Sequence, residues 1–279
     1  MNVITLVKGR QAQLLNLIQG LEQSLLAPEA LWVVHMNEPA KIWSSARFPI
    51  YTRQVEGEGG ALPLAAARNQ ALLIDPHAAW VFLDVDCIPD PHLMGQYRDA
   101  LVVHPEALHL GQVMYLPEGA ANGLWTPQAL LSVAALHPLA VHRPGPGLPV
   151  PYPLFWSLNF ACMGALMARI GGFDPAYLGY GGEDTDFSFR AREQQVPLLD
   201  CAAVAMHQFH PSYDPPLNHF EAIVANSRLF YARWGSWPME GWLGAFANLG
   251  LVEWGSSTLE VLRPPSAAEV EGALVSWPG

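Results

Sequence analysis

The stretch Trp80-Val81-Phe82-Leu83-Asp84-Val85-Asp86 decides the fold of this 279-residue chain. Four apolar residues predict a short buried strand, and two aspartates follow where it stops. Because side chains alternate along a strand, we expect Asp84 and Asp86 to point to the same face. Two like charges so close are costly unless a cation or hydrogen-bond donors lie between them. The stretch therefore predicts either a site for Mg²⁺ or Mn²⁺, or an acid pair that forms turn and capping bonds with residues 87–91.

The flanking sequence alternates short apolar runs with longer amphipathic ones, which is typical of βα units. We expect strands at residues 3–7, 31–34 and 80–83, and helices at residues 11–26 and 63–73. This order predicts an α/β fold with a mostly parallel sheet flanked by helices. Ligands of such open sheets collect beyond the carboxyl ends of the strands, where Asp84 and Asp86 lie.

Composition narrows the class of protein. With 14 basic and 25 acidic residues the net charge is −11, which argues against a nucleic-acid-binding face. The 51% hydrophobic content supports a large core, and three widely spaced cysteines predict neither a disulfide framework nor a zinc knot. The first residues do not resemble a signal peptide, and no apolar run reaches about 18 residues. We therefore expect a cytoplasmic protein without a membrane span.

A second acidic cluster is Gly179-Tyr180-Gly181-Gly182-Glu183-Asp184-Thr185-Asp186. Acids in the first turn of a helix are favoured by the helix dipole, and Asp186 is spaced to pair with Arg190. Three acids within four residues nevertheless exceed what capping needs. The glycines, Gly182 among them, would let a ligand approach the backbone.

The carboxyl-terminal half contains further candidates. His207 and His210 follow an apolar run, so they are either structural histidines or metal ligands. Residues 138–153 are rich in proline and glycine and predict a long loop or a lid. The aromatic tail from residue 219 is expected to be helical through Trp234. Its tryptophans suit packing, a sugar face or a peripheral membrane contact, and these alternatives stay open.

Four pieces in this order resemble a GT-A nucleotide-sugar glycosyltransferase of the family 2 type. They are residues 64–69 (LAAARN), Asp84-Val85-Asp86, Gly172-Phe173-Asp174 with residues 181–186 (GGEDTD), and His207. The carboxyl half is similar to the β-1,4-galactosyltransferase and polypeptide N-acetylgalactosaminyltransferase group. The resemblance implies a single GT-A (Rossmann-like) domain with a nucleotide-sugar-binding half at residues 1–116. An acceptor and catalytic half would follow at 117–218, and a helical tail at 219–279 would pack on the same domain.

The resemblance also implies roles for individual residues. Asp86 would bind a Mn²⁺ or Mg²⁺ that bridges the donor phosphates, with His207 as a further ligand and His210 as the competing choice. Asp84 would contact the ribose or a metal-bound water. Asp184 would be the base that takes the proton of the acceptor, and Glu183 beside it would contact a sugar. Donor contacts would come from Arg68 and Gly182, nucleobase contacts from Asn37 and Glu38, and a further sugar contact from Asn159.

The function expected from these residues is metal-dependent transfer of a sugar from a nucleoside diphosphate sugar to a saccharide or other hydroxyl acceptor. A uridine diphosphate sugar is the first choice of donor. With Asp184 as base the transfer would invert the anomeric centre, although related retaining enzymes share much of this segment. Two alternatives remain. One is a non-catalytic sugar-nucleotide-binding protein of the same fold. The other is a dehalogenase-type phosphatase, which expects a lysine after D-x-D, whereas Lys8 and Lys41 both precede it.

Overall fold

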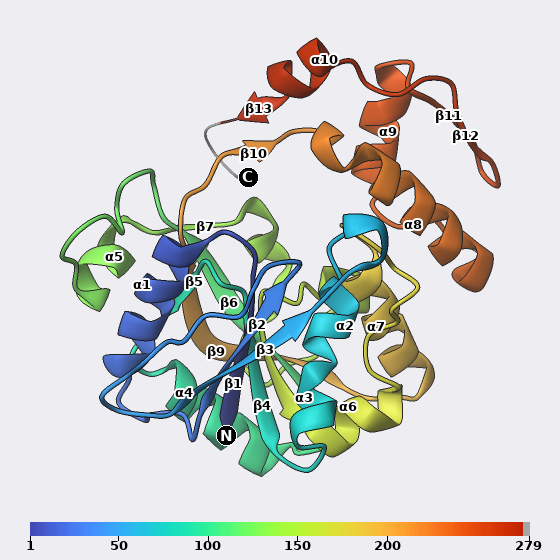
Figure 1. Ribbon diagram of the computed structural model, residues 1–279. Coiled ribbons are helices and arrows are strands. Elements are labelled where there is room, and N and C mark those ends of the chain that lie inside the picture. The colour runs from blue at the N-terminus through green and yellow to red at the C-terminus, as the bar shows by residue number, and fades with distance from the viewer. Residues whose placement is uncertain (276–279) are drawn as a thin grey trace.

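A computed structural model describes residues 1–275 of the chain (Figure 1). Its central sheet has nine strands in the order β3-β2-β1-β4-β8-β6-β9-β5, with β7 paired to β6. The bounds are β1 (Asn2–Val7), β2 (Leu31–Met36), β3 (Ile50–Val55), β4 (Ala79–Leu83), β5 (Cys87–Pro89), β6 (Leu108–Tyr115), β7 (Ala135–Leu136), β8 (Asn159–Met163) and β9 (Leu198–His207).

Six strands of this sheet run in one direction, which confirms the expected mostly parallel α/β fold. Strands β3, β2, β1 and β4 are mutually parallel. Strand β8 is antiparallel to both β4 and β6, so β6 and its parallel neighbour β9 share the direction of β4. The carboxyl ends of β1, β2, β4, β6 and β9 therefore meet along one edge.

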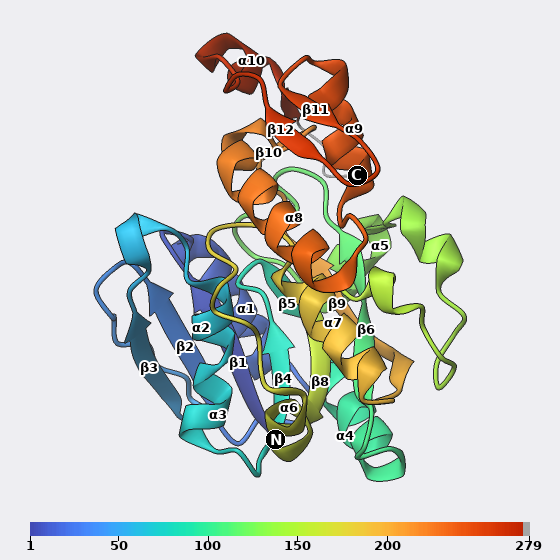
Figure 2. The ribbon, with the colours of Figure 1, turned by 90° about the vertical axis from the view of Figure 1, so that its right-hand side faces the viewer.

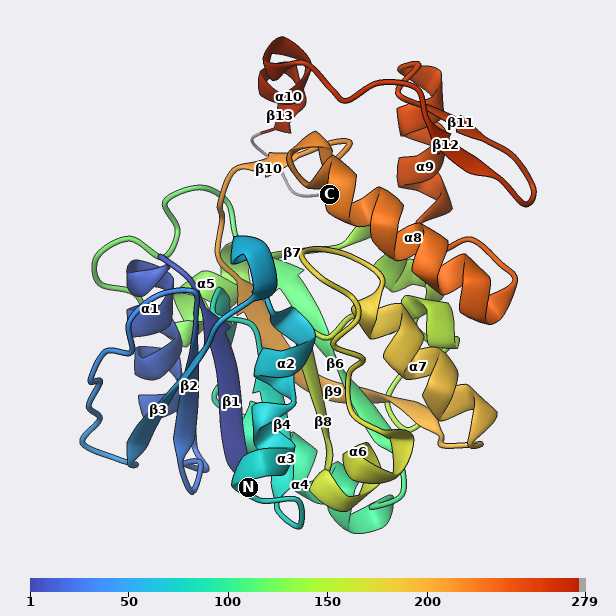
Figure 3. The ribbon, with the colours of Figure 1, turned by 45° about the vertical axis from the view of Figure 1, so that its right-hand side comes forward.

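Helices cover both faces of the sheet, which explains why a central strand such as β4 is apolar throughout. One apolar cluster includes residues of α1 (Gln11–Glu22) and α4 (Leu93–Val103). The opposite cluster includes residues of α2 (Leu64–Arg68), α3 (Gln70–Ile74), α6 (Gly164–Ile170) and α7 (Glu183–Glu193). Figure 3 shows α2, α3, α6 and α7 together on one side of the strands.

Several expected elements have different bounds. The helix expected over 11–26 ends at Glu22, and the one expected over 63–73 is divided into α2 and α3. Asn69 lies at this division, where its amide exchanges hydrogen bonds of 2.7 and 2.8 Å with the backbone of Phe173. The proline-rich segment is a loop with two short 3₁₀ turns, η2 (Pro138–His142) and η3 (Tyr152–Leu154), after α5 (Pro127–Val133).

The carboxyl-terminal residues form a layer beyond the carboxyl edge of the sheet (Figures 1 and 2). They comprise α8 (Phe220–Trp234), α9 (Glu240–Asn248), α10 (Ala267–Gly272), and the pairs β10 (Ser212–Tyr213) with β13 (Leu274–Val275) and β11 (Val252–Trp254) with β12 (Leu259–Val261). The helix through Trp234 is thus confirmed. The Trp237 indole N–H donates to the Gly255 carbonyl at 2.9 Å, so this tryptophan packs within the layer. Within residues 1–275, no helix has the length and hydropathy of a membrane span.

Candidate functional site

The first acidic pair lies in a turn rather than in a strand. Strand β4 ends at Leu83, and the Cys87 N–H donates to the Asp84 carbonyl at 2.9 Å, which closes the turn. The alternation of strand side chains therefore does not apply to this pair, and our reason for placing both on one face was wrong. Asp84 instead lies 3.6 Å from Arg68, whereas Asp86 turns toward two histidines.

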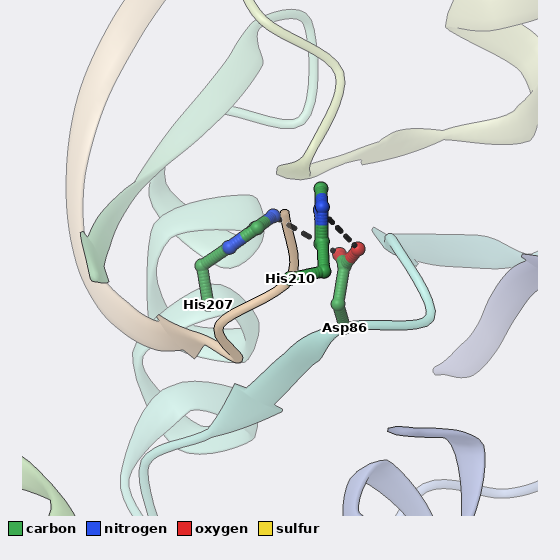
Figure 4. Close-up of side chains that lie close together, drawn as sticks. All are labelled: Asp86, His207 and His210. Carbon is green, nitrogen blue, oxygen red and sulfur yellow. Dashed lines mark ion pairs between the residues drawn. The ribbon is translucent and has the colours of Figure 1, made fainter. Parts of the chain in front are cut away.

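Asp86, His207 and His210 converge in the manner of a metal site (Figure 4). One ligand atom from each lies within 4.8 Å of the others, and each histidine Nε2 is 3.4 Å from an Asp86 carboxylate oxygen. The pairing of β5 with β9 sets Cys87 opposite His207, which brings the histidine segment against the turn. The structure thus adds His210 to the cluster and leaves Asp84 outside it.

The charges around Asp86 favour its ionised form. Burial alone would raise the pKa of Asp86, but His207, Arg10 and His210 together hold it well below its usual range. Burial lowers the pKa of His207, which favours the neutral imidazole that binds metals. Asp86 Oδ1 and His207 Nδ1 are buried without a hydrogen-bond partner. A cation beside the Asp86 carboxylate would give its unpartnered Oδ1 atom a partner.

Arg10 is a site residue that the sequence reasoning missed. It follows β1 after Lys8 and Gly9, and its guanidinium forms an ion pair with Asp86. The signal was present, because a basic residue just after a parallel strand lies at the same edge as Asp86.

Arg68 connects the two acidic clusters. Its buried guanidinium lies 3.0 Å from Glu183 Oε1 and 3.6 Å from Asp84 Oδ1. Burial raises the pKa of Asp84 to about 6, against the opposing charge of Arg68. Arg68 thus lies between the two acidic clusters, and the donor contact expected of it stays a prediction.

The first turn of α7 contains two aspartates with different surroundings. Asp184 Oδ1 accepts a hydrogen bond of 2.7 Å from the Thr185 N–H, and burial together with the neighbouring Glu183 raises the pKa of Asp184 to about 7. Asp186 is fully buried and pairs with Arg190 at 2.8 Å and Arg233 at 2.6 Å. Its pairing with Arg190 confirms the structural alternative for this residue, whereas Asp184 is left to face the site.

Comparisons with known proteins agree with this geometry. Residues 137–210 match the family model described as the N-terminal domain of galactosyltransferase. A segment of 49 residues, 18% of this chain, is 37% identical to validoxylamine A glucosyltransferase from two subspecies of Streptomyces hygroscopicus, jinggangensis and limoneus. It covers only 12% and 11% of those relatives.

Solved structures resemble most of the chain. The fold is similar to that of GalNAc-T7, solved with UDP, GalNAc and Mn²⁺, with a TM-score of 0.53 and 13% identity over 83% of this chain and 49% of that one. Staphylococcus aureus TarS 1–349 in complex with UDP-GlcNAc gives a TM-score of 0.56 and 13% identity over 81% of this chain and 65% of that one. This chain therefore has the GT-A fold of these glycosyltransferase structures. It spans about half the length of GalNAc-T7 and about two thirds of the TarS fragment.

Two residues expected to contact ligand, Gly182 and Asn159, have close protein neighbours. Gly182 precedes α7 with a φ of +89°, and a Cβ there would lie 3.3 Å from the Tyr177 ring. The space on this side of Gly182 is filled by protein, so a ligand would not approach its backbone from there. Asn159 is fully buried, accepts from the Tyr97 hydroxyl at 2.6 Å and donates to the carbonyls of Gln112 and Ala203.

The residues expected at the nucleobase lie near the site but already have protein partners. The Asn37 amide donates to the carbonyls of Gly60 and Ala61 and accepts from the Gly57 N–H, so it shapes the loop after β3. Glu38 Oε2 accepts from the Gly9 N–H at 2.8 Å. Glu38 therefore supports the turn that carries Arg10.

Proposed function

We propose that this protein transfers a sugar from a nucleoside diphosphate sugar to a hydroxyl acceptor, with a bound divalent metal and with Asp184 as base. The observation that carries the proposal is that the Asp86 cluster and an acid with a raised pKa lie at one sheet edge, joined through Arg68. A uridine diphosphate sugar is the proposed donor, since GalNAc-T7 and TarS were solved with UDP or UDP-GlcNAc.

The proposed metal ligands are Asp86, His207 and His210. One carboxylate and two imidazoles suit Mn²⁺ better than Mg²⁺, which prefers oxygen ligands throughout. When bound, such an ion would neutralise the negative charge that develops on the diphosphate leaving group. Asp84 would face the donor ribose, and Arg10 and Arg68 would add positive charge beside the phosphates.

The proposed proton acceptor is Asp184. With a pKa of about 7, it is partly ionised at neutral pH and basic enough to take a proton from an attacking hydroxyl. Glu183, held by Arg68 at 3.0 Å, is fixed beside it for contact with a sugar. Attack directed by a base on the face opposite the leaving group would invert the anomeric centre.

This proposal retains the functional division at residues 116 and 218. The first part supplies Arg10, Arg68 and the Asp84–Asp86 turn, and the second supplies Glu183, Asp184 and the histidines. The third part, from residue 219, contacts the second part through hydrogen bonds that the Asn226 amide donates to the carbonyls of Leu178 and Gly181.

A donor screen tests the proposal directly. UDP-glucose, UDP-galactose, UDP-GlcNAc and UDP-GalNAc are each incubated with the protein, with and without Mn²⁺, and thermal stabilisation and UDP release are measured. We expect a Mn²⁺-dependent response to at least one donor, lost in Asp86→Asn and kept in the control Asp99→Asn, an exposed acid on α4. No response to any donor would overturn the proposal. Binding without UDP release, even with acceptors added, would favour the non-catalytic alternative.

A further inference from the structure

A pocket opens between β6 and the segment at residues 154–158. It is a small pocket, partly open to solvent, and its exposed lining is more apolar than polar. Its lining comprises Leu110, Gly111, Gln112, Val113, Tyr115, His137, Leu139, Ala140, Arg143, Leu154, Trp156 and Leu158.

The pocket lies directly beside the proposed reaction centre. On one side, the Leu158 carbonyl accepts a hydrogen bond of 2.9 Å from the Asp84 N–H. On the other, the Tyr115 ring centroid is 5.0 Å from that of His207. The backbone of Ser157, which lies between the lining residues Trp156 and Leu158, is hydrogen-bonded to the Asp184 carboxylate. A molecule in this pocket is therefore next to both the metal cluster and the base.

The lining is mostly apolar, and its one charged side chain is already paired. Arg143 donates to the carbonyls of Leu110 and Gly111 at 2.8 Å and pairs with Asp200, so its guanidinium is already satisfied. His137 accepts from the Leu139 N–H at 3.1 Å, and burial lowers its pKa, which keeps it neutral. Most other walls are aliphatic or aromatic. The other polar side chains of the lining are those of Gln112, Tyr115 and Trp156, so most of the surface that a ligand would meet is apolar. A sugar hydroxyl placed against that apolar surface would lack a partner, at a cost in binding free energy.

We propose that this pocket binds an apolar group of the acceptor, an aryl or short alkyl substituent that carries the hydroxyl to be glycosylated. This inference rests on the proposed function and specifies its acceptor class. The aromatic side chains Tyr115, His137 and Trp156 supply faces for an aryl ring, with the His137 and Trp156 rings 4.9 Å apart at a steep angle. The exposed Leu136 and Leu139 continue the apolar surface at the same segment.

Ligand-observed fluorine NMR tests the pocket with two matched probes. The probes are 4-fluorobenzyl alcohol and 3-deoxy-3-fluoroglucose, each titrated into the full chain in the presence of Mg²⁺ and UDP. The wild type should broaden the aryl alcohol signal at millimolar concentration and leave the sugar signal sharp. Ala140→Phe, which fills the pocket, should weaken aryl binding at least tenfold.

The control is Val141→Phe, because Val141 is the next residue, is 80% exposed and lies outside the lining. It should bind the aryl alcohol as the wild type does. If Ala140→Phe lowers the thermal midpoint, Leu139→Asp at the half-exposed rim replaces it and should also weaken aryl binding.

The inference is overturned if neither probe binds, if the sugar binds instead of the aryl alcohol, or if the filling variants bind like the wild type. Donor binding is scored separately by the Mn²⁺-dependent response to UDP-sugars. Aryl binding without any donor response would therefore contradict the proposed function alone, and a donor response without aryl binding would contradict only the acceptor class.

Discussion

The turn after β4 and the first turn of α7 contain the same local pattern, Asp84-Val85-Asp86 and Asp184-Thr185-Asp186, and the fold treats the two copies differently. In the α7 copy, Asp186 is satisfied by Arg190 and Arg233 and also accepts from the Trp234 indole at 3.0 Å. In the β4 copy, Asp86 has cationic neighbours but keeps an unpartnered buried oxygen. The difference teaches that an acid with all its partners supports the fold, whereas an acid with an open position is available to a ligand.

The largest expected effect is on Asp86. Asp86→Asn removes the anionic member of the metal cluster, and we expect Mn²⁺ binding to be lost and UDP release to fall about 1,000-fold, because a metal supplies several kcal/mol to the transition state. Calorimetric Mn²⁺ titration and coupled UDP detection measure both. Tight Mn²⁺ binding by the variant would contradict the contrast between the two acids, since Asp86 would then be no more available to a ligand than Asp186.

Asp184→Asn should lower kcat about 100- to 1,000-fold while donor affinity stays within a factor of three, because a general base acts in the chemical step. Steady-state kinetics with UDP-sugar, together with a UDP titration, separate the two quantities. A variant with unchanged kcat would show that Asp184 is not the base.

Asp186→Ala should act on stability. We expect the free energy of unfolding to fall by about 2–3 kcal/mol, because Arg190 loses its carboxylate partner, whereas the partly buried Arg233 keeps Asp174. Urea unfolding measures the change, and the matched control is Asp184→Ala, which lies two residues earlier in the same helical turn. Equal losses in the two variants would contradict the division between a structural and a functional acid.

The smallest expected effect is the dependence of kcat/KM on pH. Since Asp184 must be ionised to accept a proton, kcat/KM should rise about tenfold per pH unit below pH 7 and level off above it, following a pKa of about 7.

The same raised pKa means that the native state holds a proton which the unfolded chain releases from about pH 4. Stability from this group is therefore greatest below pH 4 and declines as pH rises to 7. Asp184→Asn should remove this stability slope, and a variant that keeps it would assign the slope to another group such as Asp84.

Much of the fold could be read from local patterns. Apolar runs predicted the cores of β1, β2 and β4, and the acidic clusters were correctly placed at the ends of elements. The bounds failed where a distant contact decides them. One example is the division at Asn69, whose amide is bound by Phe173, more than 100 residues away. A single-sequence pattern does not contain that partner.

The sequence by itself determined which residue types stand at the carboxyl edge of the sheet, because strand ends and helix starts follow from periodicity and glycine placement. Only the tertiary structure decided the role of each residue. In the folded chain, Asp186 and Asn159 are bound by protein partners. His210 and Arg10 lie against Asp86, and Arg68 lies between Asp84 and Glu183. The physical reason is that a polar group becomes structural or available according to its buried partners, and here those partners lie tens to more than a hundred residues away along the chain.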